Sequence, residues 1–246
     1  MNCLGIIGGS GLYGLDSEGE VRLERAGSPF GAPSGPLNRL RVHGRELVFI
    51  ARHGEHHTIP PHAINYRANV WALKTAGVEA IVAVNAVGSI RRDWPCGTLV
   101  VPDQLIDHTW GRAHTFFEKN FDDSKHVDFT WPFDSRLRGR VLQAVHAAGE
   151  QAIDGATLVV TQGPRLETRA EIDAFEKAGG ELVGMTTMPE AALAREAGLP
   201  YATLALVVNP AAGRQQETIT MEGIRLALAE GMERVQRCLQ TLVKQT

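Results

Sequence analysis

The stretch Leu4-Gly5-Ile6-Ile7-Gly8-Gly9-Ser10-Gly11-Leu12 decides the fold of this chain. Its apolar first half predicts a buried parallel strand, and its glycines are typical of the sharp turn that follows such a strand. Glycines let the backbone turn and expose N–H groups, and the hydroxyl of Ser10 adds another donor. Strand, turn and hydroxyl together favour a cradle for an anion such as phosphate.

Three known motifs compete for these residues, and none fits completely. The letters of Gly9-x-Gly11-x-x-Gly14 match the dinucleotide fingerprint, but residues 15–20 lack the apolar stripe of the helix that must follow it. A P-loop needs a lysine that this stretch lacks, and Leu12 stands where the hydrolase elbow needs a glycine. A plain glycine turn without a ligand remains open from this stretch alone.

Length and composition restrict the class of protein. The chain has 246 residues, an apolar content of 43%, a charged content of 22% and a formal net charge of −3. These values favour one globular α/β domain over residues 1–246 and give no reason to expect nucleic acid as a partner. Three distant cysteines, no leader-like segment and no apolar run of spanning length favour a cytoplasmic protein with no membrane partner.

Strand-like and helix-like segments alternate along the chain, which predicts a single layered α/β domain with a mixed central β-sheet flanked by helices. Strands are predicted at residues 21–25, 37–42, 46–51, 78–84, 98–106, 156–161, 181–185 and 201–208, with a hairpin turn at His43-Gly44. Helices are predicted at residues 62–75, 137–148, 169–178, 189–197 and 220–243, the last with Thr220 as its N-cap. The irregular, aromatic residues 110–133 favour an oligomer interface.

Small and polar residues follow at least four of these strands. The carboxyl ends of the strands form the edge where open α/β sheets bind ligands, so several polar ends together favour a pocket. Arg52 and His53 follow one such strand, and a guanidinium can grip an anion with two N–H groups. His53, His56, His57 and His62 invite a metal interpretation, but the prolines and glycine among them predict a loop whose spacing matches no zinc motif, so no metal is expected.

Six motifs in this order resemble those of the trimeric purine nucleoside phosphorylases, most closely those of the methylthioadenosine phosphorylase branch. They are Gly8-Gly9-Ser10-Gly11, Arg52-His53-Gly54, His57-Thr58-Ile59-Pro60 with Asn65-Tyr66-Arg67-Ala68-Asn69, Asn85-Ala86-Val87-Gly88-Ser89, Gly163-Pro164-Arg165-Leu166-Glu167-Thr168 and Gly184-Met185-Thr186-Thr187-Met188-Pro189-Glu190. The resemblance covers nearly the whole chain. It implies phosphorolysis of a purine nucleoside, with inorganic phosphate as co-substrate, no cofactor and no metal. It also implies a homotrimer in which a neighbouring subunit contributes to each site.

The resemblance also implies roles for individual residues. The residues implied to bind phosphate are Ser10, Arg52, His53, Asn85 and Thr186. Met185 would pack beneath the ribose, with Ala86 on the floor of the site, while Leu166 and Ala211 would also contact the substrate. Met221 and Ile224 would line the subsite of the 5′ substituent, and His126 would reach that subsite from a neighbouring subunit.

Three positions depart from the methylthioadenosine branch. Asn85 replaces its usual threonine, whereas Glu167 and Asn209 match the phosphorylases of 6-oxopurines. The Asn209 amide can donate to the oxo group and accept from nitrogen 7 once that atom is protonated, and the Glu167 carboxylate can accept from the nitrogen 1 hydrogen. Such a site rejects a base that leaves these groups unpaired. Asn209 and Glu167 are therefore the expected catalytic residues.

A thioether and an aliphatic chain at Met221 and Ile224 suit a 5′-methylthio group better than a hydroxyl. We therefore expect phosphorolysis of S-methyl-5′-thioinosine to hypoxanthine and 5-methylthioribose 1-phosphate, a step of purine salvage. The alternatives are an inosine/guanosine phosphorylase, a methylthioadenosine phosphorylase, a non-catalytic nucleoside-binding protein and a dinucleotide-dependent dehydrogenase. In the simpler interpretations Met221 is a core residue and Glu167 only pairs with Arg165 or Arg169.

Overall fold

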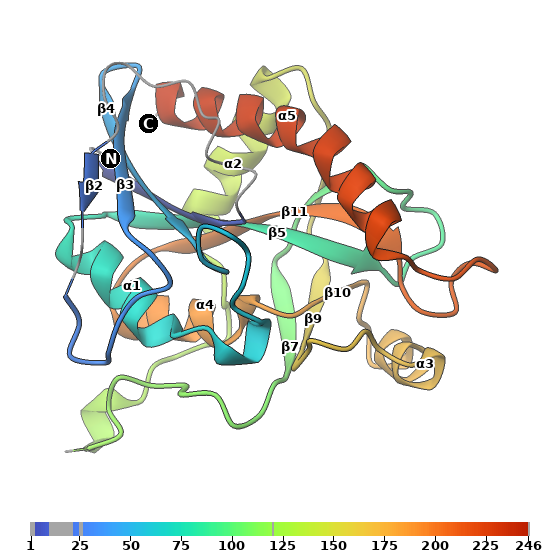
Figure 1. Cartoon of the computed structure of the whole chain (residues 1–246), viewed down its shortest axis with the longest axis horizontal. Coiled ribbons are helices and arrows are strands. Elements are labelled where there is room, and N and C mark those ends of the chain that lie inside the picture. The colour runs from blue at the N-terminus through green and yellow to red at the C-terminus, as the bar shows by residue number, and fades with distance from the viewer. Residues whose placement is uncertain (1–2, 10–21, 25–26, 120, 246) are drawn as a thin grey trace.

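A computed structural model of the chain describes residues 3–9, 22–24, 27–119 and 121–245. These residues form one mixed sheet of eleven strands, with helices packed on both of its faces (Figure 1). The α/β class predicted from the sequence, with a mixed central sheet flanked by helices, is confirmed.

The first predicted strand lies in the middle of this sheet. β1 (Cys3–Gly8) runs parallel to β4 (Arg45–Ala51) on one side and to β5 (Ala80–Ser89) on the other. All six of its residues are buried, as expected for a strand covered on both faces. Ser10 and the glycine turn up to Gly14 lie outside the described residues.

The hairpin of β3 (Leu37–Val42) and β4, with β2 (Arg22–Glu24) next to β3, extends the sheet to one edge. β2 pairs antiparallel with β3, and β3 pairs antiparallel with β4. His43 and Gly44 close the hairpin with φ angles of 50° and 76°, in the left-handed region that two-residue hairpin turns require. The predicted turn is confirmed.

Two long strands and one short strand form the other half of the sheet's centre. β11 (Tyr201–Pro210) runs parallel to β5, and β10 (Leu182–Gly184) pairs antiparallel with the end of β5. The prediction that the strand at residues 78–84 ends before Asn85 is wrong, because β5 continues to Ser89. The small and polar residues near the end of β5 have low strand propensity, but β10 and β11 supply backbone partners on both sides.

The strand predicted at residues 98–106 is in fact two strands. β6 (Leu99–Val101) pairs with β11 and with β8 (Ala152–Asp154), whereas β7 (Gln104–His108) pairs with β9 (Thr157–Thr161). Pro102 separates them because proline has no N–H group for a ladder. The sequence missed β8, whose three residues are too few to show a period.

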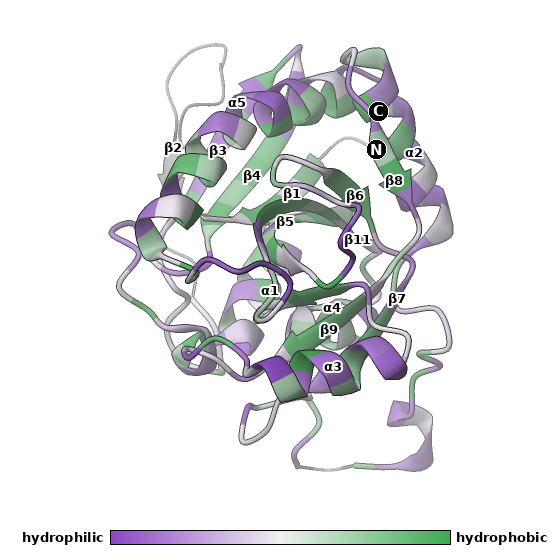
Figure 2. Ribbon diagram, turned by 90° about the vertical axis from the view of Figure 1, so that its right-hand side faces the viewer, coloured by the Kyte–Doolittle hydropathy of each residue, from purple (hydrophilic) through white to green (hydrophobic). Residues whose placement is uncertain are grey.

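Helices cover the sheet in two pairs. α1 (Tyr66–Thr75) and α4 (Thr187–Glu196) lie on one face, while α2 (Ser135–Ala147) and α5 (Met221–Gln245) lie on the other (Figure 1). Each pair closes its own hydrophobic cluster against the strands. Figure 2 shows the hydrophobic strands enclosed by helices that carry hydrophilic residues on their outer sides. No helix among the described residues is long and apolar enough to pass through a bilayer.

Capping side chains set where the helices begin. The helix predicted from His62 instead splits into a 3₁₀ turn, η2 (Pro61–Ala63), and α1, because the Asn65 side chain accepts from Ala68 N and caps α1. α3 (Arg169–Lys177) begins after a capping box of Thr168 and Glu171. The Thr220 hydroxyl accepts from Gly223 N at 3.1 Å, so the predicted N-cap of α5 is confirmed.

Candidate active site

The predicted site residues gather along β5 and at the ends of the strands around it. Asn85 and Ala86 belong to β5 itself, Arg52 follows β4, and Asn209 lies near the end of β11. Ala86 is the one exposed residue of β5, in an otherwise buried strand. Ala86 is therefore accessible from outside the sheet, unlike its neighbours in β5.

Asn85 and Thr186 meet across the β5–β10 pairing. Asn85 Nδ2 donates to Thr186 Oγ1 at 2.8 Å, and both side chains are buried. Asn85 Oδ1 is buried with no hydrogen-bond partner among the described residues, which is a costly state for a polar atom. If the amide is turned by 180°, Oδ1 accepts from the Thr186 hydroxyl and Nδ2 is left to donate to a ligand. The pair can therefore offer an N–H to an anion.

Arg52 is fully buried and bound to a carboxylate that the sequence analysis did not assign. Its Nε and Nη2 donate to the two oxygens of Glu190 at 2.9 and 2.8 Å, and its Nη1 donates to Val84 O at 3.2 Å. Burial disfavours the charge, but Glu190 outweighs burial and holds the pKa of Arg52 above its ordinary value. The Tyr201 hydroxyl also donates to Glu190. An anion would meet the remaining N–H groups on Nη1 and Nη2.

His53 is held as a neutral imidazole. Its Nδ1 lies 2.8 Å from Ile59 O, and a carbonyl only accepts, so the proton is on Nδ1 and Nε2 has a free lone pair. Burial, helped by the charge of Arg52, lowers the pKa of His53 to about 4. The His53 ring lies 4.4 Å from the ring of His57. Burial and the charge of Arg225 on α5 also lower the pKa of His57. Within the described part of the chain, no three His, Cys, Asp or Glu residues cluster as metal ligands.

Glu167 lies in the turn between β9 and α3. The Thr161 hydroxyl donates to Glu167 Oε1 at 2.6 Å, while Arg165 forms a two-bond ion pair with Glu171. Glu167 therefore does not depend on Arg165 as a partner. Gly163 has a φ of +60°, and a Cβ there would lie 2.6 Å from Met185 Sδ. Met185 thus packs directly on the turn that leads to Glu167.

Asn209 follows an irregularity in β11. The pairing with β5 shifts between Val207 and Asn209, and such a bulge re-aims the side chains beside it. Asn209 Nδ2 donates to Pro210 O at 2.8 Å and lies 3.2 Å from where a Cβ on Gly88 would be. Gly88 therefore leaves the space that the Asn209 amide occupies.

The loop after Asn209 is fastened to α3, the helix that starts just beyond Glu167. Ala211 is buried in a cluster with Ile172 and Phe175 of α3. Arg214 then binds Asp173 and Glu176 of the same helix. The structure thus brings the Asn209 and Glu167 segments together, although Ala211 itself packs in the core.

The residues predicted at the 5′ subsite lie at the surface. Met221, at the start of α5, is 58% exposed, so its interpretation as a core residue is wrong. Ile224 is half-buried, and Leu166 is exposed at 39%. His126 is exposed beside Phe121 in the outer part of residues 110–133, next to η3 (Asp123–Lys125) and far from α5 (Figure 1). Within one chain the structure therefore does not bring His126 to the other residues.

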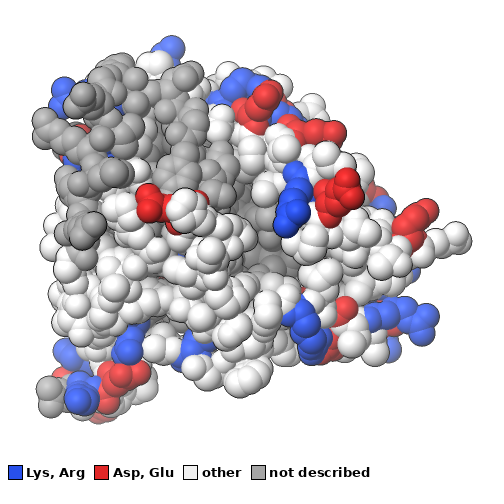
Figure 3. Space-filling model, viewed as in Figure 1, with Lys and Arg blue, Asp and Glu red and all other residues white. Residues whose placement is uncertain are grey.

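The aromatic segment, residues 110–133, is only partly exposed. Trp110, Phe121 and Trp131 face solvent, whereas Phe133 is buried and Phe116 packs against the core. On the face shown in Figure 3, charged residues of both signs are interspersed, mainly toward the edges of the molecule. This face has no extended patch of one sign among the residues coloured there.

Sequence reasoning missed the buried charged residues Glu190, Arg112 and Arg214, of which the first two contact the segments of the predicted site. Glu190 stands inside a quoted motif, and a carboxylate in a buried segment was a signal that it needed a cationic partner. Arg112 lies in the irregular segment, where an isolated arginine reads as a solvated side chain. Only the three-dimensional structure shows that Arg112 is buried.

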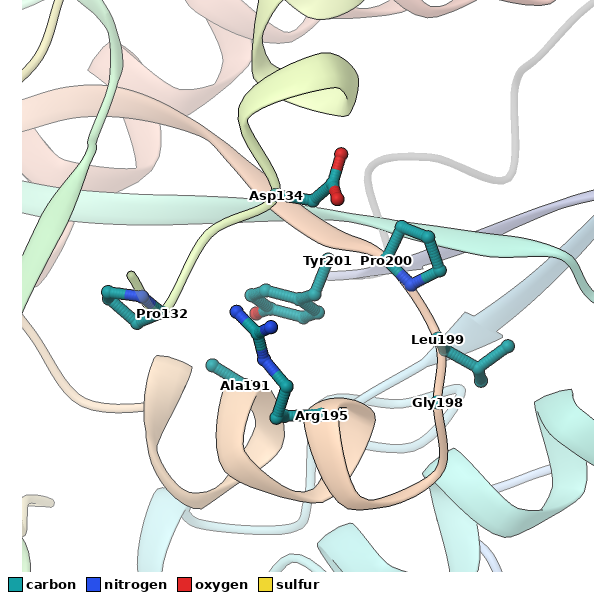
Figure 4. A pocket seen from close by; sticks show the side chains of 8 residues that line it. All are labelled: Pro132, Asp134, Ala191, Arg195, Gly198, Leu199, Pro200 and Tyr201. Atoms are coloured by element: carbon teal, nitrogen blue, oxygen red, sulfur yellow. The ribbon is translucent and has the colours of Figure 1, made fainter. Parts of the chain in front are cut away.

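A cavity of about 200 Å³ lies elsewhere, at the start of β11. Its lining side chains come from the end of the aromatic segment, from α4 and from β11, and they include Pro132, Arg195 and Tyr201 (Figure 4). Tyr201 and Asn209 stand at opposite ends of β11. The cavity therefore lies at the opposite end of β11 from Asn209, and the hydroxyl of its Tyr201 reaches Glu190, the partner of Arg52.

Comparison with known proteins gives consistent matches over nearly the whole chain. The model of the Phosphorylase superfamily matches residues 4–244. A Pseudomonas syringae protein named probable S-methyl-5′-thioinosine phosphorylase is 50% identical over 97% of each chain. The 6-oxopurine nucleoside phosphorylase of Pyrococcus furiosus is 42% identical over 98% of this chain and 89% of its own. The structure of Schistosoma mansoni methylthioadenosine phosphorylase with adenine superposes with a TM-score of 0.91, at 34% identity over 98% of this chain and 90% of that one.

Proposed function

Because the chain belongs to the Phosphorylase superfamily, we propose that it catalyses the phosphorolysis of S-methyl-5′-thioinosine to hypoxanthine and 5-methylthioribose 1-phosphate, as a step of purine salvage. The relatives from Pseudomonas syringae and Pyrococcus furiosus support this proposal, since their names specify a thioinosine or a 6-oxopurine substrate. In the reaction a phosphate oxygen bonds to the anomeric carbon as the bond from that carbon to the purine breaks. The purine takes the electron pair of that bond. The proton of HPO₄²⁻ moves to the purine, which leaves as neutral hypoxanthine.

The observation that carries the base assignment is the hydrogen bond from Thr161 to Glu167. The hydroxyl donates its proton to Oε1 of the Glu167 carboxyl group. Oε2 is then left to accept the nitrogen 1 hydrogen of a 6-oxopurine. The Asn209 amide supplies the complementary donor for the oxo group and an acceptor for protonated nitrogen 7. The Asn209 donor stabilises the negative charge that develops on the departing base, while Glu167 holds the base in position.

For phosphate we propose Ser10, Arg52, His53, Asn85 and Thr186 as ligands. The Thr186 hydroxyl binds Asn85 and does not cap α4, so it stands beside the Asn85 amide that would meet the anion. Because His53 is neutral with a lone pair on Nε2, it suits the protonated oxygen of HPO₄²⁻.

The remaining features extend the same proposal. Met185 and Ala86 would bind the ribose, and Leu166 and Ala211 would line the purine side. Met221 and Ile224 would bind the 5′-methylthio group, where His126 of a neighbouring subunit would cover the exposed thioether in a homotrimer.

We further propose that residues 1–246 form one phosphorylase domain that works in the cytoplasm without a cofactor. The three free cysteines agree with a reducing compartment. A trimer of three 26.7 kDa chains is testable by light scattering on the purified protein.

Two other substrates have specific support. The Pyrococcus furiosus relative favours an inosine or guanosine phosphorylase, which would need a polar 5′ subsite. The Schistosoma mansoni structure favours methylthioadenosine, which would require Asn209 to accept a 6-amino group.

The test is chromatography of the bases released from methylthioinosine, methylthioadenosine, inosine and adenosine, with and without phosphate. We expect phosphate-dependent cleavage of methylthioinosine well above the other three. Preference for inosine would leave the Glu167 and Asn209 assignment intact and refute the methylthio subsite. Preference for methylthioadenosine would refute the base assignment, and no cleavage of any substrate would indicate a binding role.

A further inference from the structure

Arg112 is a buried cation that the proposed reaction has not used. It follows Gly111 in the segment after β7 and is 9% exposed. Among the described residues no carboxylate lies within ion-pair distance of Arg112, and burial lowers the pKa of its guanidinium below the ordinary value. A buried charge without a counter-ion is costly unless hydrogen bonds satisfy it fully.

Oxygen atoms from three separate segments satisfy the guanidinium instead. Nε donates to Gln162 Oε1 at 3.1 Å, and Nη2 donates to Gln162 O at 2.8 Å and Thr161 O at 3.2 Å. Nη1 donates to Met188 O at 2.5 Å, to Met185 O at 2.9 Å and to the Tyr66 hydroxyl at 3.1 Å. All five N–H groups of an arginine therefore have acceptors.

These acceptors are the backbone on which the proposed site residues stand. Thr161 holds the Glu167 carboxylate through its hydroxyl, and Gln162 precedes the glycine on which Met185 packs. Met185 O and Met188 O lie on either side of Thr186. The Arg112 guanidinium thus links two segments. One is the end of β9, which leads into the turn that carries Glu167, and the other is the start of α4, next to the proposed ribose and phosphate residues Met185 and Thr186.

We propose that Arg112 is a positioning residue that sets the separation between the Glu167 turn and the Met185–Thr186 segment. The proposal rests on the proposed function. A lysine cannot replace the arginine here, because an ammonium group has three donors on one atom and cannot span oxygens on both sides of a planar fork. An apolar side chain could fill the space but would remove a donor from six backbone and side-chain oxygens.

Arg112→Ala tests this role with a readout that a purely structural residue would not change. Displacing reacting groups by about 1 Å costs on the order of 10²-fold in rate, so we expect a loss of about that size in kcat/KM for the nucleoside. The KM for phosphate should change less, because among the proposed phosphate ligands only Thr186 lies on a segment that Arg112 holds. Guanidinium added at concentrations well below those that unfold the protein should restore part of the lost kcat/KM, whereas methylammonium should not.

Arg138→Ala is the matched control. Arg138 also donates to two backbone oxygens, Pro102 O and Val101 O, and in addition to the Asp154 carboxylate, and it lies on α2, remote from the proposed site. We expect this variant to melt at a lower temperature than the wild type, with unchanged kcat/KM and no response to guanidinium.

The outcomes separate this proposal from the proposed function. A wild-type chain without phosphorolysis would refute the function and, with it, this role. An active wild type with an equally active Arg112→Ala, or with a folded Arg112→Ala that guanidinium does not restore, would overturn the positioning role alone. Should the alanine variant fail to fold, Arg112→Lys replaces it. A folded lysine variant with wild-type kcat/KM would overturn the proposal, and a loss that is larger for the nucleoside than for phosphate would support it.

Discussion

Replacing Glu190 by glutamine should destabilise the protein far more than its conservative chemistry suggests. The side chains of Arg52 and Glu190 are 2% and 0% exposed, so neither charge is solvated by water. Glutamine keeps the shape and one acceptor oxygen, but it leaves the Arg52 guanidinium buried without a counter-ion. Removing one partner of such a pair costs about 3–5 kcal/mol, and the retained oxygen places our expectation near the lower end, at about 3 kcal/mol.

That cost is large for a folded domain. Domains typically have only about 5–15 kcal/mol of stability, and for a chain of this size 1 kcal/mol lowers the melting temperature by about 2–4 °C. We therefore expect Glu190→Gln to melt about 6–12 °C below the wild type in calorimetry. Urea unfolding should show a lower midpoint with an unchanged m-value, because the surface exposed on unfolding stays the same.

The chain contains a control with the same number of hydrogen bonds and the opposite exposure. Arg165 and Glu171 also form a two-bond pair, at 2.8 and 2.7 Å, but their side chains are 68% and 36% exposed. Water solvates these charges in either state, and glutamine can still complete the capping box of α3. Glu171→Gln should therefore melt close to the wild type. Equal, small losses in the two variants would refute the argument that burial gives the Arg52–Glu190 pair its importance.

Three further predictions concern the site. Thr161→Val removes a hydrogen bond to a charged group, and such a bond contributes about 1.5–3 kcal/mol. The value of kcat/KM for the nucleoside should therefore fall at least about tenfold, whereas Thr161→Ser should stay near wild type. Asn209→Asp loses the donor to the oxo group, so steady-state kinetics should show a fall of up to about a hundredfold on methylthioinosine and a gain in the relative rate on methylthioadenosine. The pKa of His53 falls from its ordinary value of 6.5 to about 4 in the folded protein, which therefore favours the neutral ring. The contribution of this ring to the stability of the fold is complete above pH 6.5 and declines toward pH 4. Urea unfolding of the wild type should therefore lose up to about 3 kcal/mol more over this range than that of His53→Gln.

Local chemistry explains the features that could be predicted from the sequence. The apolar run of β1, the His43-Gly44 turn and the Thr220 cap each depend on neighbours a few residues away. A capping hydroxyl or a residue at positive φ acts within one turn of chain, so its signal is complete in the sequence. The same holds for the polar residues after the strands, whose position follows from where the strands end.

Tertiary pairing explains the features that were predicted wrongly. The extension of β5 through Asn85 and Ser89 exists because β10 and β11 lie beside it, and nothing near Asn85 in sequence shows those partners. The separation of β6 from β7 likewise depends on β8 and β9. Pro102 was a visible signal for that break, whereas the three residues of β8 gave none.

The site itself divides in the same way. The resemblance indicated which residues carry chemistry, but not which residues hold them in place. Glu190 reaches Arg52 across 138 positions of sequence, and Arg112 reaches Met188 across 76. Contacts over such separations are set by the packing of whole elements, so composition and spacing along the chain contain no trace of them.

The pairing of Arg52 with Glu190 affects how strongly the proposed site would attract anions other than phosphate. The cation proposed to face phosphate is already matched by a carboxylate, and His53 beside it is neutral, so these two residues and Glu190 together carry no net charge. A receptor of this kind exerts little long-range pull on nucleotides, polyphosphates or citrate, which a bare arginine cluster would attract. It would recognise its anion at contact, by the fit of donors and the one lone pair of His53. Its affinity should then vary little with ionic strength, so that changes in cellular salt would leave the rate of salvage nearly constant.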